Sequence, residues 1–213
     1  GARDLAAKLP ALLGTDIKVV GAPCIGRCEQ APAVAVGQRA VGVATLQSVV
    51  YESNRALVGE LPAQAAINFI AFDAYVKQGG YQLPQSLANG SQDALAVLKT
   101  MEDSGLRGLG GAGFPAGRKW KIVREQPAPR LLAVNIDEGE PGTFKDRHYL
   151  ERDPHRFLEG MLVAAQVAGI DAIYIYLRDE YHDCRTLLSA EIAKLQANPP
   201  CPLPTIELRR GAG

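Results

Sequence analysis

The sequence of 213 residues predicts an α/β fold with a parallel, doubly wound sheet in its C-terminal half. Residues 130–135, 172–177 and 205–208 are apolar or alternating segments with the length of strands. Between them, residues 154–168 and 184–195 carry apolar side chains at helical spacing. The order β-α-β-α-β is the unit of a parallel sheet, and ligands of such sheets bind beyond the carboxyl ends of the strands.

Residues 1–58 predict a smaller unit that precedes this sheet. Leucines at helical spacing indicate a helix over residues 3–13, and a second helix is expected around residues 44–51. Short apolar segments predict strands at 17–20 and 33–36.

Residues 59–90 predict a connector, because proline, glutamine and the pair Gly79-Gly80 interrupt any regular pattern. A short helix is expected within it at residues 72–77. The remaining chain, residues 91–213, begins with an apolar-periodic helix at 93–103, and residues 118–124 predict a further short helix or strand.

The composition excludes several classes of protein. The 23 basic and 23 acidic residues cancel, so no electrostatic footprint for nucleic acid or an anionic membrane is present. No apolar run has the ~18 residues of a membrane span, and four cysteines do not make a disulfide framework. We expect a cytoplasmic protein without membrane insertion. The abrupt first residues and the final Gly-Ala-Gly suggest a fragment, or the ordered part, of a longer subunit.

A glycine-rich run occupies residues 104–120. Within it Gly108, Gly110 and Gly113 satisfy G-x-G-x-x-G, and Lys119 follows as a cation suited to phosphate. Glycine lets backbone N–H groups approach an anion closely. A predicted helix precedes the run, however, so the ordinary dinucleotide fingerprint is not expected. The alternative is a glycine-rich turn between two helices.

An acidic loop follows the first strand of the predicted sheet. Asn135, Asp137, Glu138 and Glu140 lie within six residues. Carboxylates so close repel one another, which favours a role in accepting hydrogen bonds from ligand hydroxyls or a flavin edge. The alternative is a solvated turn. Together with the glycine run, the loop describes a nucleotide site at the end of a strand.

Cys24 and Cys28 are separated by three residues in a Pro/Gly-rich loop, where both thiolates can reach one metal centre. A [2Fe–2S] cluster needs four ligands, and Cys184 and Cys201 lie far along the chain. The alternative is a pair of ordinary thiols on a loop.

The three histidines predict no catalytic acid–base set, and we assign no catalytic residue. His148, His155 and His182 are scattered. His148 and His155 are seven residues apart and are expected on a helix surface or in capping positions.

Two regions of the chain resemble a known family. Residues 17–36 resemble the second cysteine pair of the thioredoxin-like [2Fe–2S] domain that accompanies the NADH-oxidising flavoprotein of respiratory complex I. Residues 105–120 and 135–147 resemble the FMN- and NADH-binding subunit of that complex. The resemblance implies a partial thioredoxin-like domain over 1–58, a linker, and a Rossmann-like parallel α/β flavin domain, incomplete, over 91–213.

The resemblance also implies which residues bind cofactors. The flavin is expected to contact the glycine loop and the cation after it: Gly108, Gly110, Gly111, Gly113 and Lys119. It is also expected to contact the acidic loop: Asn135, Asp137 and Glu138. Two residues are expected to face NAD(H): Phe114 and Glu140. Cys24 and Cys28 would ligate a [2Fe–2S] cluster, and a [4Fe–4S] cluster would have its ligands outside this segment.

The function that the resemblance implies is that of a diaphorase subunit, which transfers hydride between NAD(H) and FMN. Leu109 stands where many relatives carry arginine, and the cysteine-pair and flavin regions share one chain. The fusion resembles soluble formate dehydrogenases and hydrogenases, and the glycine run with Leu109 resembles the β subunit of NAD-dependent formate dehydrogenase, whose partner is a molybdenum- or tungsten-type α subunit. The alternatives are a diaphorase of an NAD-linked hydrogenase or of a complex I-like enzyme, and a non-catalytic nucleotide-binding scaffold.

Overall fold

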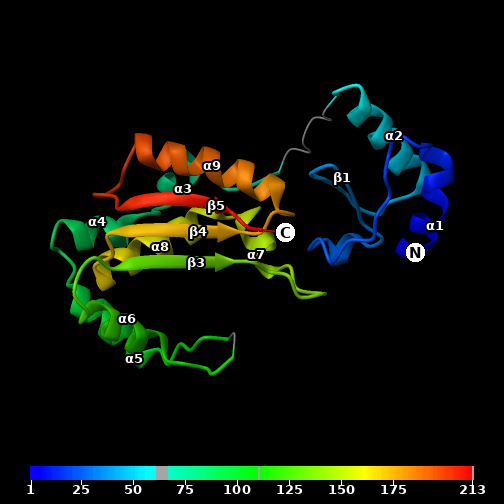
Figure 1. Ribbon diagram of the computed structural model, residues 1–213. Coiled ribbons are helices and arrows are strands. Elements are labelled where there is room, and N and C mark those ends of the chain that lie inside the picture. Colours follow the sequence, from blue (N-terminus) through cyan, green and yellow to red (C-terminus); the bar gives the residue numbers. More distant parts are fainter. Residues whose placement is uncertain (61–66, 110, 213) are drawn as a thin grey trace.

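The computed structural model describes residues 1–60, 67–109 and 111–212. A small N-terminal region stands beside a larger region built on a parallel sheet (Figure 1). The elements of the small region are α1 (Ala2–Leu13), the 3₁₀ turn η1 (Cys28–Gln30), β1 (Val34–Val36), β2 (Arg39–Val41) and α2 (Leu46–Leu57). Its own core includes Leu5, Leu9, Ala44 and Val49.

The larger region confirms the predicted β-α-β-α-β order. Its sheet has the strand order β3-β4-β5, and all three strands are parallel. The strands are β3 (Leu131–Ile136), β4 (Ala172–Leu177) and β5 (Thr205–Arg210). Helix α8 (Pro154–Ala168) connects β3 to β4, and α9 (His182–Ala197) connects β4 to β5.

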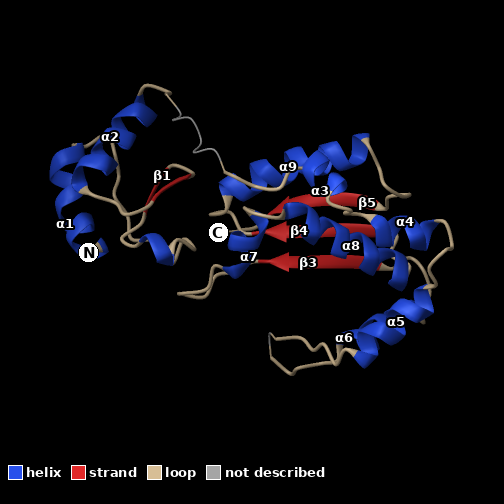
Figure 2. Ribbon diagram, turned by 180° about the vertical axis from the view of Figure 1, so that it is seen from behind, coloured by secondary structure: helices blue, strands red, loops and turns tan. Residues whose placement is uncertain are grey.

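The main core lies on one face of the central strand. Ile173, Ile175 and Leu177 of β4 are fully buried, and Leu158 and Leu162 of α8 belong to the same cluster. Figure 2 shows α8 lying across the strands. Within the described ranges, every helix is too short or too polar to span a membrane.

Part of the expected connector packs against the larger region. It forms α3 (Phe72–Lys77), as predicted, and α4 (Gln82–Ala88), which was not expected. Phe72 and Tyr81 are buried in the main core. The linker boundaries stay a prediction, since residues 61–66 lie outside the described residues.

Three helices flank the two candidate binding loops. The glycine run connects α5 (Ala94–Asp103) to α6 (Ala116–Arg124), so the open choice at 118–124 resolves as helix. Helix α7 (Lys145–Leu150), which the sequence did not predict, follows the acidic loop.

The predicted strand at residues 17–20 is absent. These residues form no strand, and Val20 is largely exposed. A strand requires a hydrogen-bonded partner, and the local hairpin supplies one only to β1. The antiparallel pair β1–β2 turns at Gly37, whose φ of 60° favours glycine.

His155 was expected on a helix surface or as a cap and is instead fully buried. Its Nδ1 lies 2.7 Å from Tyr81 Oη, and its Nε2 lies 2.8 Å from Glu191 Oε2. A buried imidazole needs partners for both nitrogens, and these two residues, far apart in sequence, supply them.

Candidate functional site

The acidic loop leaves the carboxyl end of β3 and separates its side chains. Asn135 Oδ1 accepts a 2.9 Å hydrogen bond from the backbone N–H of Asp137, which turns the chain. Asp137 and Glu140 are exposed, whereas Glu138 is only 5% exposed. Two carboxylates are thus accessible to a ligand, and one points into the protein.

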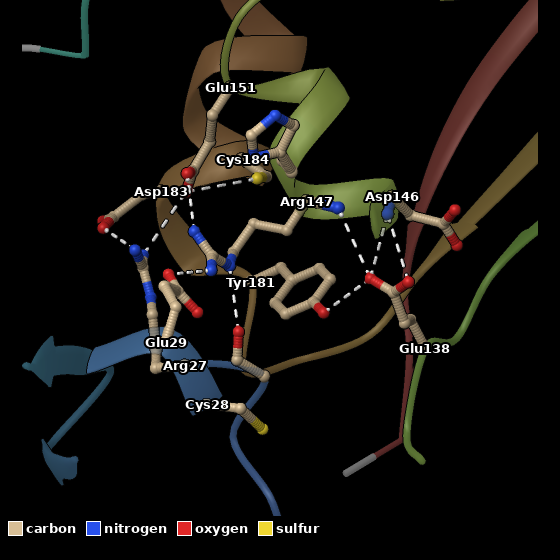
Figure 3. Close-up of polar contacts among 12 residues, drawn as sticks. Arg27, Cys28, Glu29, Glu138, Asp146, Arg147, Glu151, Tyr181, Asp183 and Cys184 are labelled. Atoms are coloured by element: carbon tan, nitrogen blue, oxygen red, sulfur yellow. Dashed lines mark hydrogen bonds and ion pairs between the residues drawn. The ribbon is translucent and has the colours of Figure 1, made fainter. Parts of the chain in front are cut away.

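The buried carboxylate of Glu138 binds the start of α7 (Figure 3). It accepts hydrogen bonds from the N–H of Asp146 at 3.1 Å and of Arg147 at 3.4 Å, from Tyr181 Oη at 2.9 Å and from Lys145 Nζ at 3.2 Å. Burial alone would raise the pKa of Glu138, but these donors outweigh it and hold the pKa below its ordinary value. Glu138 therefore anchors the loop.

The glycine run forms a hairpin. Gly108 N–H donates to Phe114 O at 3.0 Å, and Ala116 N–H donates to Leu106 O at 2.8 Å. Gly113 has a φ of 62° that favours glycine. A Cβ placed on Gly108, Gly111 or Gly113 would meet no side chain within 4 Å, so the backbone of the hairpin is open to a ligand. Gly110 lies outside the described residues.

The cation and the aromatic residue of this hairpin are both accessible. Lys119 is exposed in α6, directly after the hairpin, and Phe114 carries the guanidinium of Arg118 at 5.9 Å from its ring centre. Leu109, at the tip, is 97% exposed. Among the described residues, no hydrogen bond joins the hairpin to the acidic loop.

The two cysteines of the N-terminal loop lie together. Cys24 Sγ and Cys28 Sγ are 3.3 Å apart, and both thiols are free. The N–H of Gly26 lowers the pKa of Cys24, whereas the neighbouring Cys24 raises the pKa of Cys28, so the thiolate form is favoured at Cys24. Gly26 has a φ of 68°, and a Cβ there would come within 2.5 Å of the Tyr181 ring, so this turn requires glycine.

This pair fits two ligands of one iron. In the part of the chain that the structure describes, no three potential metal ligands come together, so two further cluster ligands would have to come from elsewhere. Cys184 and Cys201 do not join the pair. Cys184 lies near Glu151, and Cys201 accepts a hydrogen bond from Gln166 at 3.0 Å.

Buried charges hold the cysteine loop against the larger region (Figure 3). Arg147 donates to Gly26 O at 3.0 Å and pairs with Glu29 and Glu151. Arg27, within the cysteine loop, pairs with Asp183 of α9 at 3.3 Å. The loop therefore lies at the carboxyl edge of the sheet, where the parallel fold predicts ligands.

Arg178 joins the cysteine loop to the acidic loop directly. Its guanidinium donates to Cys24 O at 2.7 Å and to Glu138 O. The backbone N–H of Gly142, in the acidic loop, also donates to Cys28 Sγ at 3.2 Å.

Sequence reasoning missed the roles of Arg147, Arg178 and Tyr181. Their position in the sequence could have indicated Arg178 and Tyr181, because both residues follow the carboxyl end of β4, where ligands of parallel sheets bind.

Comparisons with known proteins place the C-terminal half of the chain in one family. A sequence profile described as the Nuo51 FMN-binding domain matches residues 101–213. One subunit of the NADH-quinone oxidoreductase of Aquifex aeolicus is 46% identical over 111 residues, 52% of this chain and 26% of that protein. The mitochondrial NADH-ubiquinone oxidoreductase 51 kDa subunit of Neurospora crassa is 43% identical over 107 residues, 48% of this chain and 22% of that protein.

A solved structure extends the likeness to the N-terminal region. The NAD⁺-reducing [NiFe]-hydrogenase in the air-oxidized state aligns with 100% of this chain and 40% of its own, with a TM-score of 0.78 and 30% identity. The chain thus spans less than half the length of each of these relatives.

Proposed function

The chain belongs to the Nuo51 FMN-binding domain family, and we propose that it is the FMN- and NAD(H)-binding part of a diaphorase subunit. The subunit transfers hydride between NAD(H) and FMN and exchanges electrons with a partner catalytic subunit through iron–sulfur clusters. Bound flavin supplies the conversion between a two-electron hydride and single electrons. The protein supplies binding, orientation and the electrostatic environment.

One observation supports this proposal most strongly, the hydrogen bond from Gly142 N–H to Cys28 Sγ. It connects the loop proposed to hold the nucleotide to a residue proposed to ligate iron. Two redox groups that exchange electrons need such proximity, and an isolated nucleotide-binding scaffold does not.

Each candidate residue has a role in this proposal. The open backbone of Gly108, Gly111 and Gly113 approaches the flavin, and Lys119 binds its phosphate. Asp137 and Asn135 present polar atoms to the flavin from the acidic loop. Glu138 keeps that loop in place through its bonds to α7, and its own contact to the flavin stays a prediction.

Exposed Glu140 and Phe114 face NAD(H) in this proposal. Gly110 completes the glycine loop. The ligands of a [4Fe–4S] cluster are proposed to lie outside this segment.

Two partners fit the proposed diaphorase. The resemblance of the glycine run with Leu109 is the argument for a formate dehydrogenase with a molybdenum- or tungsten-type α subunit. The alignment of the whole chain with a single hydrogenase chain supports a hydrogenase as the second candidate.

The test uses the full-length subunit in its native complex. We expect visible absorbance of flavin and iron–sulfur, and reduction of ferricyanide by NADH. A colourless protein without NADH oxidation would instead be a scaffold. Reduction of NAD⁺ by the complex with formate, and separately with hydrogen gas, then identifies the partner.

A further inference from the structure

The side chain of Arg178 bridges two loops that the sequence places far apart. The residue is 4% exposed, and its guanidinium donates to the backbone carbonyl oxygens of Cys24 and Glu138. Glu180 fixes the orientation of this group by two further hydrogen bonds, at 3.1 and 2.6 Å. Because a guanidinium is planar and rigid, it fixes the carbonyl oxygens of the two loops relative to each other.

A second hydrogen bond connects the acidic loop to Cys28, the other cysteine of the pair. Gly142 N–H donates to Cys28 Sγ at 3.2 Å. Hydrogen bonds to the sulfur ligands of an iron–sulfur cluster are among the factors that set its reduction potential. Gly142 has a φ of 87°, so the direction of its N–H depends on a conformation that favours glycine.

Both connections start from the same short loop. Glu138 and Gly142 are four residues apart, and exposed Glu140 lies between them. A flavin that binds to this loop and moves its backbone changes the bond to Cys24 and the bond to Cys28 together.

We propose that Arg178 and Gly142 couple the acidic loop to Cys24 and Cys28, so that FMN binding shifts the reduction potential of the cluster that these two cysteines ligate. This rests on the proposed function, because it requires both groups. Arg178 acts here as a positioning residue. By thermodynamic linkage, the redox state of the cluster then changes the affinity for FMN by the same factor.

The structure also supplies a control. Arg27 lies within the cysteine loop and pairs with Asp183 and Glu151, and within the described ranges it makes no ion pair with the acidic loop. Arg27→Gln therefore removes one ion-pair contact of the cysteine loop while the residues of both connections are retained, and it controls for a general loosening of that loop. Arg178→Lys keeps the charge and removes the fork that spans the two carbonyls.

The experiment is a redox titration of the full-length protein, followed by electron paramagnetic resonance of the [2Fe–2S] signal, with FMN bound and after its removal. We expect FMN to shift the one-electron equilibrium of the wild-type cluster at least tenfold, which is about 59 mV. The shift should fall below threefold in Arg178→Lys and persist in Arg27→Gln. An equal shift in wild type and Arg178→Lys, or none in wild type, overturns the coupling.

A second variant covers the case in which Arg178→Lys does not fold. Gly142→Ala has open space for its methyl group but strains the backbone, so the N–H should turn from Cys28. The potential of the FMN-bound cluster should change and its FMN-dependent shift should fall; an unaltered titration contradicts the coupling. Iron and acid-labile sulfide are measured first. If the wild-type protein contains no cluster, both the cluster assignment and the coupling are wrong. If the cluster is intact but its reduction potential does not depend on FMN, only the coupling is wrong.

Discussion

The phenol of Tyr181 donates a 2.9 Å hydrogen bond to the buried carboxylate of Glu138. The same ring packs so closely on Gly26 that a Cβ there would come within 2.5 Å of it. Tyr181 thus contacts both the acidic loop and the cysteine loop, although it comes from the segment after β4. The site is assembled from three distant parts of the chain, and its variants should separate binding from stability.

Glu138→Gln should lower stability at neutral pH by about 1–3 kcal/mol, the range for losing a charged hydrogen-bond acceptor. The pKa of Glu138 lies below its ordinary value of 4.5, so its stabilisation is complete above that value and is lost as pH falls through the folded-state pKa. Urea unfolding of wild type and variant should therefore converge in acid. Exposed Glu140→Gln is the matched control, and a pH-independent difference for Glu138→Gln would contradict the assignment.

Replacing Cys24 and Cys28 together with serine should remove one [2Fe–2S] signal from the electron paramagnetic resonance spectrum of the full-length protein. Serine does not provide the thiolates that the cluster needs. Cys201→Ser, at a cysteine buried away from the pair, should leave the spectrum unaltered. An unchanged spectrum in the double variant rules out the assignment.

Lys119→Ala should weaken FMN binding by roughly 10- to 100-fold, because a charged hydrogen bond to phosphate contributes about 1.5–3 kcal/mol. Flavin retained after dialysis gives the measurement. Lys99→Ala, an exposed lysine on α5 paired with Asp103, is the control for lost surface charge. Equal flavin content in both variants would make Lys119 a surface charge only.

Glu140→Gln should raise KM for NADH by roughly tenfold and leave flavin content intact, since its side chain is exposed and a charged hydrogen bond contributes about 1.5–3 kcal/mol. Glu138→Gln should instead reduce flavin content. Steady-state NADH oxidation with an artificial acceptor, beside flavin quantification, compares the two. Equal loss of flavin in both variants would show that the loop acts as one structural unit.

His155→Phe should destabilise the larger region by about 1–3 kcal/mol, because it leaves both the buried Glu191 and the Tyr81 hydroxyl without one partner. Tyr81→Phe removes a single hydrogen bond to the same imidazole and should cost about 1 kcal/mol. Denaturant unfolding of both variants provides the comparison, and equal costs would mean that the Glu191 contact contributes little.

Apolar periodicity in the sequence was enough to predict the longer strands and helices of the sheet region. The strands β3, β4 and β5 and helix α8 follow from apolar periodicity, and their parallel order follows from the alternation of strand and helix. The short elements β1 and α3 match the segments predicted at 33–36 and 72–77, whereas strand β2 and helix α7 were missed, because elements this short give only a weak periodic signal. The strand expected at 17–20 failed because apolar residues alone do not supply a pairing partner.

By itself the sequence determined the candidate loops: the glycine run, the carboxylates after β3 and the spacing of Cys24 and Cys28. Only the tertiary structure decided that Glu138 is buried while Glu140 is exposed, and that Arg178 connects Cys24 to the acidic loop. The physical reason is the distance along the chain over which each interaction acts. Spacing and backbone preference act between neighbours in sequence, whereas a buried guanidinium must find acceptors wherever packing has brought them, here 154 residues away.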